Sequence, residues 1–159
     1  MTFPPAVPST QQVKFSKNHT PALILRVLLG AWFTYAGCLK VFVTGLGPFA
    51  LDIANYKLLP TPLILLTAYL IPWAEIIAGT CFMLGILRKG AWFAMLGLVL
   101  AFTLSVGSAW ARGLDISCGC LGSSEKISYW RKAIEFSLYL LTLAYLATHD
   151  LRPTPTPIE

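Results

Sequence analysis

The stretch GAWFAMLGLVLAFTLSVGSAWA, residues 90–111, contains 22 residues and no charged side chain. As a helix rising 1.5 Å per residue it would extend ~33 Å, which matches the hydrocarbon core of a bilayer. The whole chain shares this character, because 56% of its 159 residues are hydrophobic and only 12% are charged. This composition excludes an ordinary soluble domain and indicates an integral membrane protein.

Three further apolar windows have a similar length and few charges: residues 22–43, 62–87 and 130–148. The segments between the windows are short, which favours one compact bundle over separate domains. We therefore expect an all-α protein, a bundle of four transmembrane helices formed by residues 22–149. A polar N-terminal tail, 1–21, and a proline-rich C-terminal tail, 150–159, complete the chain.

The segment between the first two windows, TGLGPFALDIANYKLLP at residues 44–60, has helical spacing of apolar residues at Phe49, Ile53 and Tyr56. Asp52 would lie on another face of that helix. We expect a short helix at the membrane interface, serving either as a lid over the bundle or as a docking surface for a soluble thiol partner.

Glycines recur in the first two of these windows. Gly30 and Gly37 lie seven residues apart, and Gly79 and Gly85 lie six apart. Small residues at such spacing allow helices to approach closely in lipid, so the two windows are expected to pack through them.

A Cys–Gly–Cys sequence follows the quoted stretch, within GLDISCGCLGSS at residues 113–124. Cysteines two positions apart have Cα atoms ~5.5–7 Å apart, which overlaps the upper part of the disulfide range. Gly119 removes the steric penalty of closing so small a ring. A disulfide between Cys118 and Cys120 would therefore be strained, easily reduced and suited to thiol exchange.

Three other interpretations of Cys118 and Cys120 stay open. They are two reduced thiols packed under the loop, a fixed structural disulfide, or two of the four ligands of a metal ion. The metal site is the weakest of these, because the only histidines, His19 and His149, belong to the other side of the membrane. No metal is therefore predicted.

Four crossings would place the loops after the first and third helices on the same side. Cys38 would lie only ~8 Å below that surface, where it is either a resolving thiol or a packing residue. Cys81 would lie near the opposite surface and pack. Lys and Arg are equally frequent on both sides. The N-terminal end of a chain usually decides orientation, which favours cytoplasmic termini and a periplasmic Cys–Gly–Cys loop.

Two charged residues interrupt the apolar windows. Glu75 would lie ~20 Å from the surface where its helix begins, as a proton relay or as a structural hydrogen-bonding partner of Tyr35 or Ser105. Lys40 would either extend to the headgroups as an anchor or stabilise a thiolate near Cys38 and the Cys–Gly–Cys loop.

Three blocks of the chain resemble a known family. The first helix, RVLLGAWFTYAGCLKVF, is similar to the opening of the DoxX-like membrane proteins. The block YKLLPTPLILLTAYLIPWAEIIAGTCFMLGILRKGAW, followed by ARGLDISCGCLGSS, resembles their MauE branch, the methylamine-utilisation membrane proteins. The most specific features are Pro72, Trp73 and Glu75, with the Cys–Gly–Cys loop before the last helix. The resemblance runs from about Arg26 to the end of the fourth window.

This resemblance implies a four-helix protein of the bacterial inner membrane that is associated with thiol–disulfide handling. Its family is thought to support maturation of disulfide-rich periplasmic partners, such as the small subunit of methylamine dehydrogenase. Cys118 and Cys120 would be the redox pair, with Cys38, Glu75 and Lys40 as auxiliary residues. Leu121 departs from the family pattern, which usually has phenylalanine there.

The leading hypothesis is therefore a membrane thiol–disulfide oxidoreductase. Its partners would be the lipid bilayer and a periplasmic thioredoxin-like protein or disulfide-rich client. A quinone is the cofactor that is compatible with this chemistry. A non-enzymatic assembly factor with a structural Cys–Gly–Cys loop is the first alternative, and a small transporter subunit using Glu75 is the second. The net charge of +5 suits anionic headgroups, and the scattered basic residues exclude a nucleic-acid site.

Overall fold

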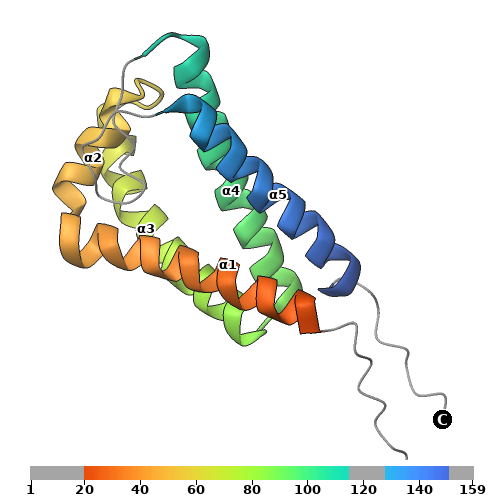
Figure 1. The fold of residues 1–159 in the computed structure, drawn as a ribbon. Coiled ribbons are helices and arrows are strands. Elements are labelled where there is room, and N and C mark those ends of the chain that lie inside the picture. The colour runs from red at the N-terminus through yellow and green to blue at the C-terminus, as the bar shows by residue number, and fades with distance from the viewer. Residues whose placement is uncertain (1–19, 115–127, 151–159) are drawn as a thin grey trace, which may run out of the picture.

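The computed structural model describes residues 20–114 and 128–150, which form helices and the turns between them (Figure 1). Within those ranges there is no strand, as the composition predicts. Five α-helices and one π-helix follow one another along the chain: α1 (Thr20–Cys38), η1 (Leu39–Thr44), α2 (Leu46–Asn55), α3 (Thr61–Leu84), α4 (Arg88–Ala111) and α5 (Tyr129–Asp150). The short helix expected between the first two windows is α2.

Three segments are long and apolar enough to cross a membrane: Thr20–Thr44, Thr61–Leu84 and Arg88–Ala111. The fourth predicted window forms α5, which is long enough but carries Arg131, Lys132 and Glu135 in its first two turns. Within residues 20–114 and 128–150, composition thus supports three crossings. The four-span count and the interfacial position of α2 stay predictions.

A glycine turn separates α3 from α4. Gly85 adopts a left-handed conformation with φ of 71°, which suits a residue without a Cβ. The amide of Ile86 donates to the carbonyl of Cys81 at 3.0 Å, and this bond satisfies a carbonyl of the last helical turn. The helix expected over 62–87 therefore ends at Leu84, and Gly85 lies in the turn that follows it.

Close packing of α1 on α3 depends on the other three glycines. A Cβ atom on Gly30 would lie 2.7 Å from the carbonyl oxygen of Gly79, and one on Gly37 would lie 2.7 Å from that of Pro72. Distances this short exclude any side chain at Gly30 and Gly37 without movement of the backbone. The prediction of close approach through these glycines is confirmed.

The main core lies between α1, α3, α4 and α5, and α4 and α5 run side by side (Figure 1). Met95, Val99 and Leu143 are fully buried there, and the indole of Trp92 donates a hydrogen bond of 2.9 Å to the Leu143 carbonyl. Large apolar side chains are also exposed on every α-helix, for example Leu28, Leu51, Leu65, Phe93 and Leu141. An apolar exterior of this extent is suited to lipid.

Candidate functional site

Cys118 and Cys120 lie outside the described residues, but the two ends of their segment are defined. The hydroxyl of Tyr129, at the start of α5, donates a hydrogen bond to the carbonyl of Leu114. The ring of Tyr129 also stacks on Trp110, with centroids 6.1 Å apart and an angle of 9° between the planes. The chain therefore leaves and re-enters the described structure at one place.

The region around Leu114 and Tyr129 is also joined to the C-terminal end of α2. The guanidinium of Arg112 donates hydrogen bonds to the carbonyls of Tyr56 and Lys57, which follow the last residue of α2. Unpaired carbonyls at the end of a helix are commonly satisfied by a basic side chain. Arg112 thereby joins the C-terminal end of α4 to the C-terminal end of α2.

A buried ion pair lies deeper in the bundle. The Nζ atom of Lys40 is 2.9 Å and 2.7 Å from the two carboxylate oxygens of Glu75, and the residues are 1% and 2% exposed. The expected hydrogen bond from Glu75 to Tyr35 or Ser105 is wrong. Tyr35 is 54% exposed, and the Ser105 hydroxyl donates to a carbonyl of its own helix. Lys40 also does not extend to headgroups, because its side chain turns inward to the carboxylate.

The π-helix η1 explains why Lys40 faces inward. A π-turn holds more residues than an α-turn, so it changes the direction in which the following side chains point. Lys40 is the second residue of η1 and is buried, whereas Phe42 and Val43 are 72% and 75% exposed. One turn earlier, a Cβ on Gly37 would lie 3.1 Å from the Cβ of Glu75, so the glycine also brings α1 close enough for the pair to form.

Two aromatic rings enclose the ammonium group. Its nitrogen lies 5.6 Å from the ring centroid of Phe49 on α2 and 5.6 Å from that of Phe102 on α4. A cation within about 6 Å of an aromatic face is attracted by the ring's quadrupole. Lys40 therefore contacts three elements at once, namely α2, α3 and α4.

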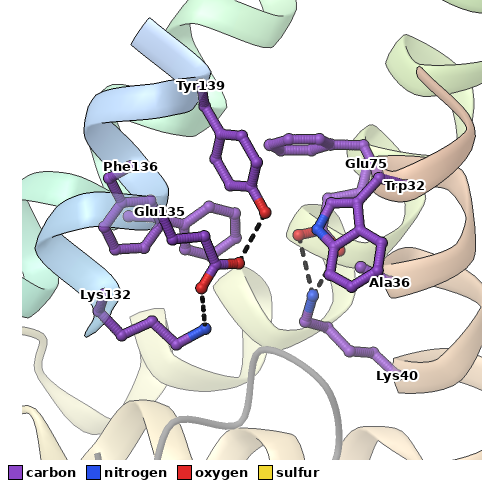
Figure 2. A pocket seen from close by; sticks show the side chains of 10 residues that line it. Trp32, Ala36, Lys40, Glu75, Lys132, Glu135, Phe136 and Tyr139 are labelled. Atoms are coloured by element: carbon purple, nitrogen blue, oxygen red, sulfur yellow. Dashed lines mark hydrogen bonds and ion pairs between the residues drawn. The ribbon is translucent and has the colours of Figure 1, made fainter. Parts of the chain in front are cut away.

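A second polar group faces this pair across a cavity of about 30 Å³ (Figure 2). Lys132 Nζ lies 2.7 Å from a carboxylate oxygen of Glu135, and the Tyr139 hydroxyl donates to the other oxygen at 2.6 Å. The cavity is large enough for about one or two water molecules. The arrangement places two carboxylates, two ammonium groups and a phenol around a space of water size.

Sequence reasoning missed this second group. Lys132, Glu135 and Tyr139 are spaced three and four residues apart, which places them on one face of a helix. That spacing was a usable signal, but nothing in the sequence indicated that this face of α5 meets the cavity beside Glu75.

The other two cysteines are free thiols of intermediate burial. Cys81 packs against the main core, in agreement with its predicted packing role. Cys38 is the last residue of α1, two positions before Lys40. Among the residues that the structure describes, no group of three His, Cys, Asp or Glu residues could hold a metal ion.

Residues 18–149 match the family described as methylamine utilisation protein MauE. The chain belongs to the MauE family. Searches of curated proteins and of solved structures gave no match. Membership of this family supports a role in methylamine utilisation. The three helices that are long and apolar enough to cross a bilayer support a multi-pass membrane protein. The part of the chain that matches MauE contains the Cys–Gly–Cys sequence, the Lys40–Glu75 pair and the second polar group.

Proposed function

We propose that this MauE-family protein exchanges thiols and disulfides with a periplasmic partner through Cys118 and Cys120. The observation that carries the proposal is the position of the Cys–Gly–Cys sequence in a short segment whose flanking residues, Leu114 and Tyr129, are hydrogen-bonded to each other. The two described ends of this segment therefore meet at one place on the bundle. A thiol pair between them would suit exchange with a soluble protein.

The proposed reaction is disulfide exchange. A thiolate of the partner attacks the disulfide, the Cys118–Cys120 bond breaks, and a mixed disulfide forms while the released sulfur takes up a proton. The partner's second thiolate then displaces the remaining cysteine. The partner gains a disulfide, and Cys118 and Cys120 become thiols, having accepted two electrons and two protons. An acceptor of the same electrons and protons must restore the disulfide.

The polar residues around the small cavity support this proposal as auxiliary groups. Thiol oxidation releases protons, and Glu75 and Glu135 are carboxylates beside a space that fits water. Lys40 keeps the Glu75 side chain fixed through two hydrogen bonds. Intramembrane ionisable residues that face the interior of a bundle commonly belong to such pathways.

An assembly factor with a structural Cys–Gly–Cys loop is the competing proposal, because the clamp between Leu114 and Tyr129 would suit a static loop equally well. The transporter hypothesis has less support. That hypothesis requires Glu75 to contact a solute, but both of its carboxylate oxygens accept hydrogen bonds from Lys40.

The test is the redox state of Cys118 and Cys120 in intact cells. Thiols are labelled in intact cells with a maleimide that cannot cross the membrane, and the reaction is then quenched with acid, with Cys81→Ser as the matched cysteine control. We expect a mixture of labelled and disulfide forms that shifts with added reductant. We also expect Cys118 of the Cys120→Ser variant to attack the disulfide of an oxidised partner and displace one of its thiolates. The resulting mixed disulfide, which has no second thiol in this chain to release it, is visible on a non-reducing gel. A pair that never changes state would overturn the exchange reaction and favour the assembly factor.

A further inference from the structure

A second and larger cavity, of about 250 Å³, lies between α2, α3 and α4. Most of the residues around it are apolar, such as Phe49 and Phe102, and a few carry hydroxyl or carboxylate groups, namely Asp52, Tyr56, Thr67 and Ser105. Ligand sites in proteins typically combine a predominantly apolar lining with a few polar groups in this way. The volume suits a single substituted ring and excludes a large cofactor such as a dinucleotide.

The polar groups of this cavity can hydrogen-bond to the oxygen atoms of a ring. Burial raises the pKa of Tyr56 to about 12, with a further contribution from the nearby Asp52, so its phenol keeps its proton and remains a donor. Ser105 and Thr67 add hydroxyl groups from α4 and α3. Phe49 and Phe102 add aromatic rings, which pack favourably against a planar ligand.

Residues of two candidate membrane-spanning helices line this cavity. Thr67 and Ile71 belong to the candidate span Thr61–Leu84, and Ala101 to Arg88–Ala111. Ala101 is exposed on the surface of α4 although it also lines the cavity. If these helices span the bilayer, the exposed Ala101 gives a ligand dissolved in lipid a route to the cavity.

The cavity also lies between the two parts of the candidate site. Phe49 and Phe102 line it and at the same time contact the Lys40 ammonium, each at 5.6 Å. On the other side, Tyr56 lines the cavity while its carbonyl accepts a hydrogen bond from Arg112, three residues before the Cys–Gly–Cys segment begins at residue 115.

We propose that this cavity binds the head group of a lipid-soluble quinone, which reoxidises Cys118 and Cys120. The inference rests on the proposed function. Forming the disulfide breaks two S–H bonds, forms one S–S bond and releases two electrons and two protons. A quinone takes up both electrons and both protons and becomes a quinol, so the reaction balances with no further reactant. A cavity entered from lipid matches an acceptor that is itself dissolved in lipid.

Binding is tested with the full-length protein in lipid nanodiscs, using decylubiquinone as the probe and equilibrium dialysis as the measurement. Ala101→Phe places a ring in the cavity and is expected to weaken binding by about tenfold or more. Leu104→Phe is the matched control, because it adds the same ring to the same helix at an exposed residue that does not line the cavity. Ala101→Leu is the smaller change to use if the phenylalanine variant does not fold.

Several results would overturn the inference. The first is no binding of decylubiquinone at all. The second is equal binding to the wild type and both Ala101 variants. The third is a co-purified phospholipid that occupies the cavity and excludes the quinone. Each of these outcomes contradicts a quinone site between α2, α3 and α4.

The redox step is measured separately, so that the inference and the proposed function can fail independently. The Cys118→Ser/Cys120→Ser protein is expected to bind decylubiquinone normally but not to convert it to quinol when a reduced dithiol protein is added. Quinone binding without quinol formation, by a wild type that still exchanges thiols, would refute the redox step of the inference and leave the proposed function standing. Loss of thiol exchange by a protein that binds quinone would refute the proposed function. Thiol exchange by a protein that binds no quinone would refute the inference alone.

Discussion

Replacing Glu75 with glutamine would leave the Lys40 ammonium buried without its counter-charge. The carboxylate accepts two charge-assisted hydrogen bonds, at 2.7 Å and 2.9 Å, and hydrogen bonds to charged groups contribute about 1.5–3 kcal/mol each. Removing one partner of a buried pair costs about 3–5 kcal/mol, because the remaining charge is uncompensated. We therefore expect Glu75→Gln and Lys40→Met each to lower the free energy of unfolding by about 3–5 kcal/mol.

The double variant Lys40→Met/Glu75→Gln separates the pair from the rest of the fold. It removes both charges and leaves one buried amide without a partner, which costs about 1–3 kcal/mol. The sum of the single variants is about 6–10 kcal/mol, so the double variant should lose several kcal/mol less than that sum.

The free energies are measured by reversible unfolding in mixed detergent micelles with increasing dodecyl sulfate, followed by circular dichroism. Glu135→Gln is the control, because its pair with Lys132 is 30% and 17% exposed and should contribute less than about 1 kcal/mol. Single variants whose losses simply add, or that lose no more than Glu135→Gln, would refute the buried ion pair.

Other predictions concern helix packing and pH. Gly79→Ala should lower stability by about 1–3 kcal/mol in the same unfolding assay, because its Cβ would lie 2.6 Å from the Thr34 hydroxyl; Gly97→Ala, where the space is open, should lose nothing. Trp92→Phe removes the hydrogen bond to the α5 backbone and should lower the free energy of unfolding by about 0.5–1.5 kcal/mol. An unfolding transition equal to that of the wild type would contradict that bond. The raised pKa of Tyr56 means that its contribution is complete below pH 10 and declines as the pH rises to about 12, since the unfolded phenol ionises first. A pH titration of unfolding should therefore be less steep for Tyr56→Phe, and equal slopes would contradict the shift.

Hydropathy predicted the helices well because a bilayer imposes one requirement on every crossing segment. The windows 90–111 and 62–87 correspond to α4 and α3 within a few residues. The error at the end of α3 arose because Ile86 and Leu87 are apolar, whereas the helix is ended by the left-handed Gly85. Hydropathy does not report backbone conformation.

The partner of Glu75 could not be predicted, for a different reason. The ion pair requires the π-helix η1 to turn Lys40 inward and Gly37 to bring α1 close to α3. Both conditions are tertiary, and the local sequence around Lys40 is equally compatible with a side chain that reaches the headgroups. The sequence identified the two charged residues in the correct windows but contained no signal that joined them.

The ion pair has a consequence for biogenesis. Lys40 and Glu75 are 35 residues apart, so the ribosome completes the helix that carries the lysine well before it makes the glutamate. A lone lysine in a membrane helix costs up to about 2.5–3.5 kcal/mol on insertion. Entry of α1 and α3 into the bilayer as a neutralised hairpin avoids that cost, so the translocon should hold the first helix until the second arrives.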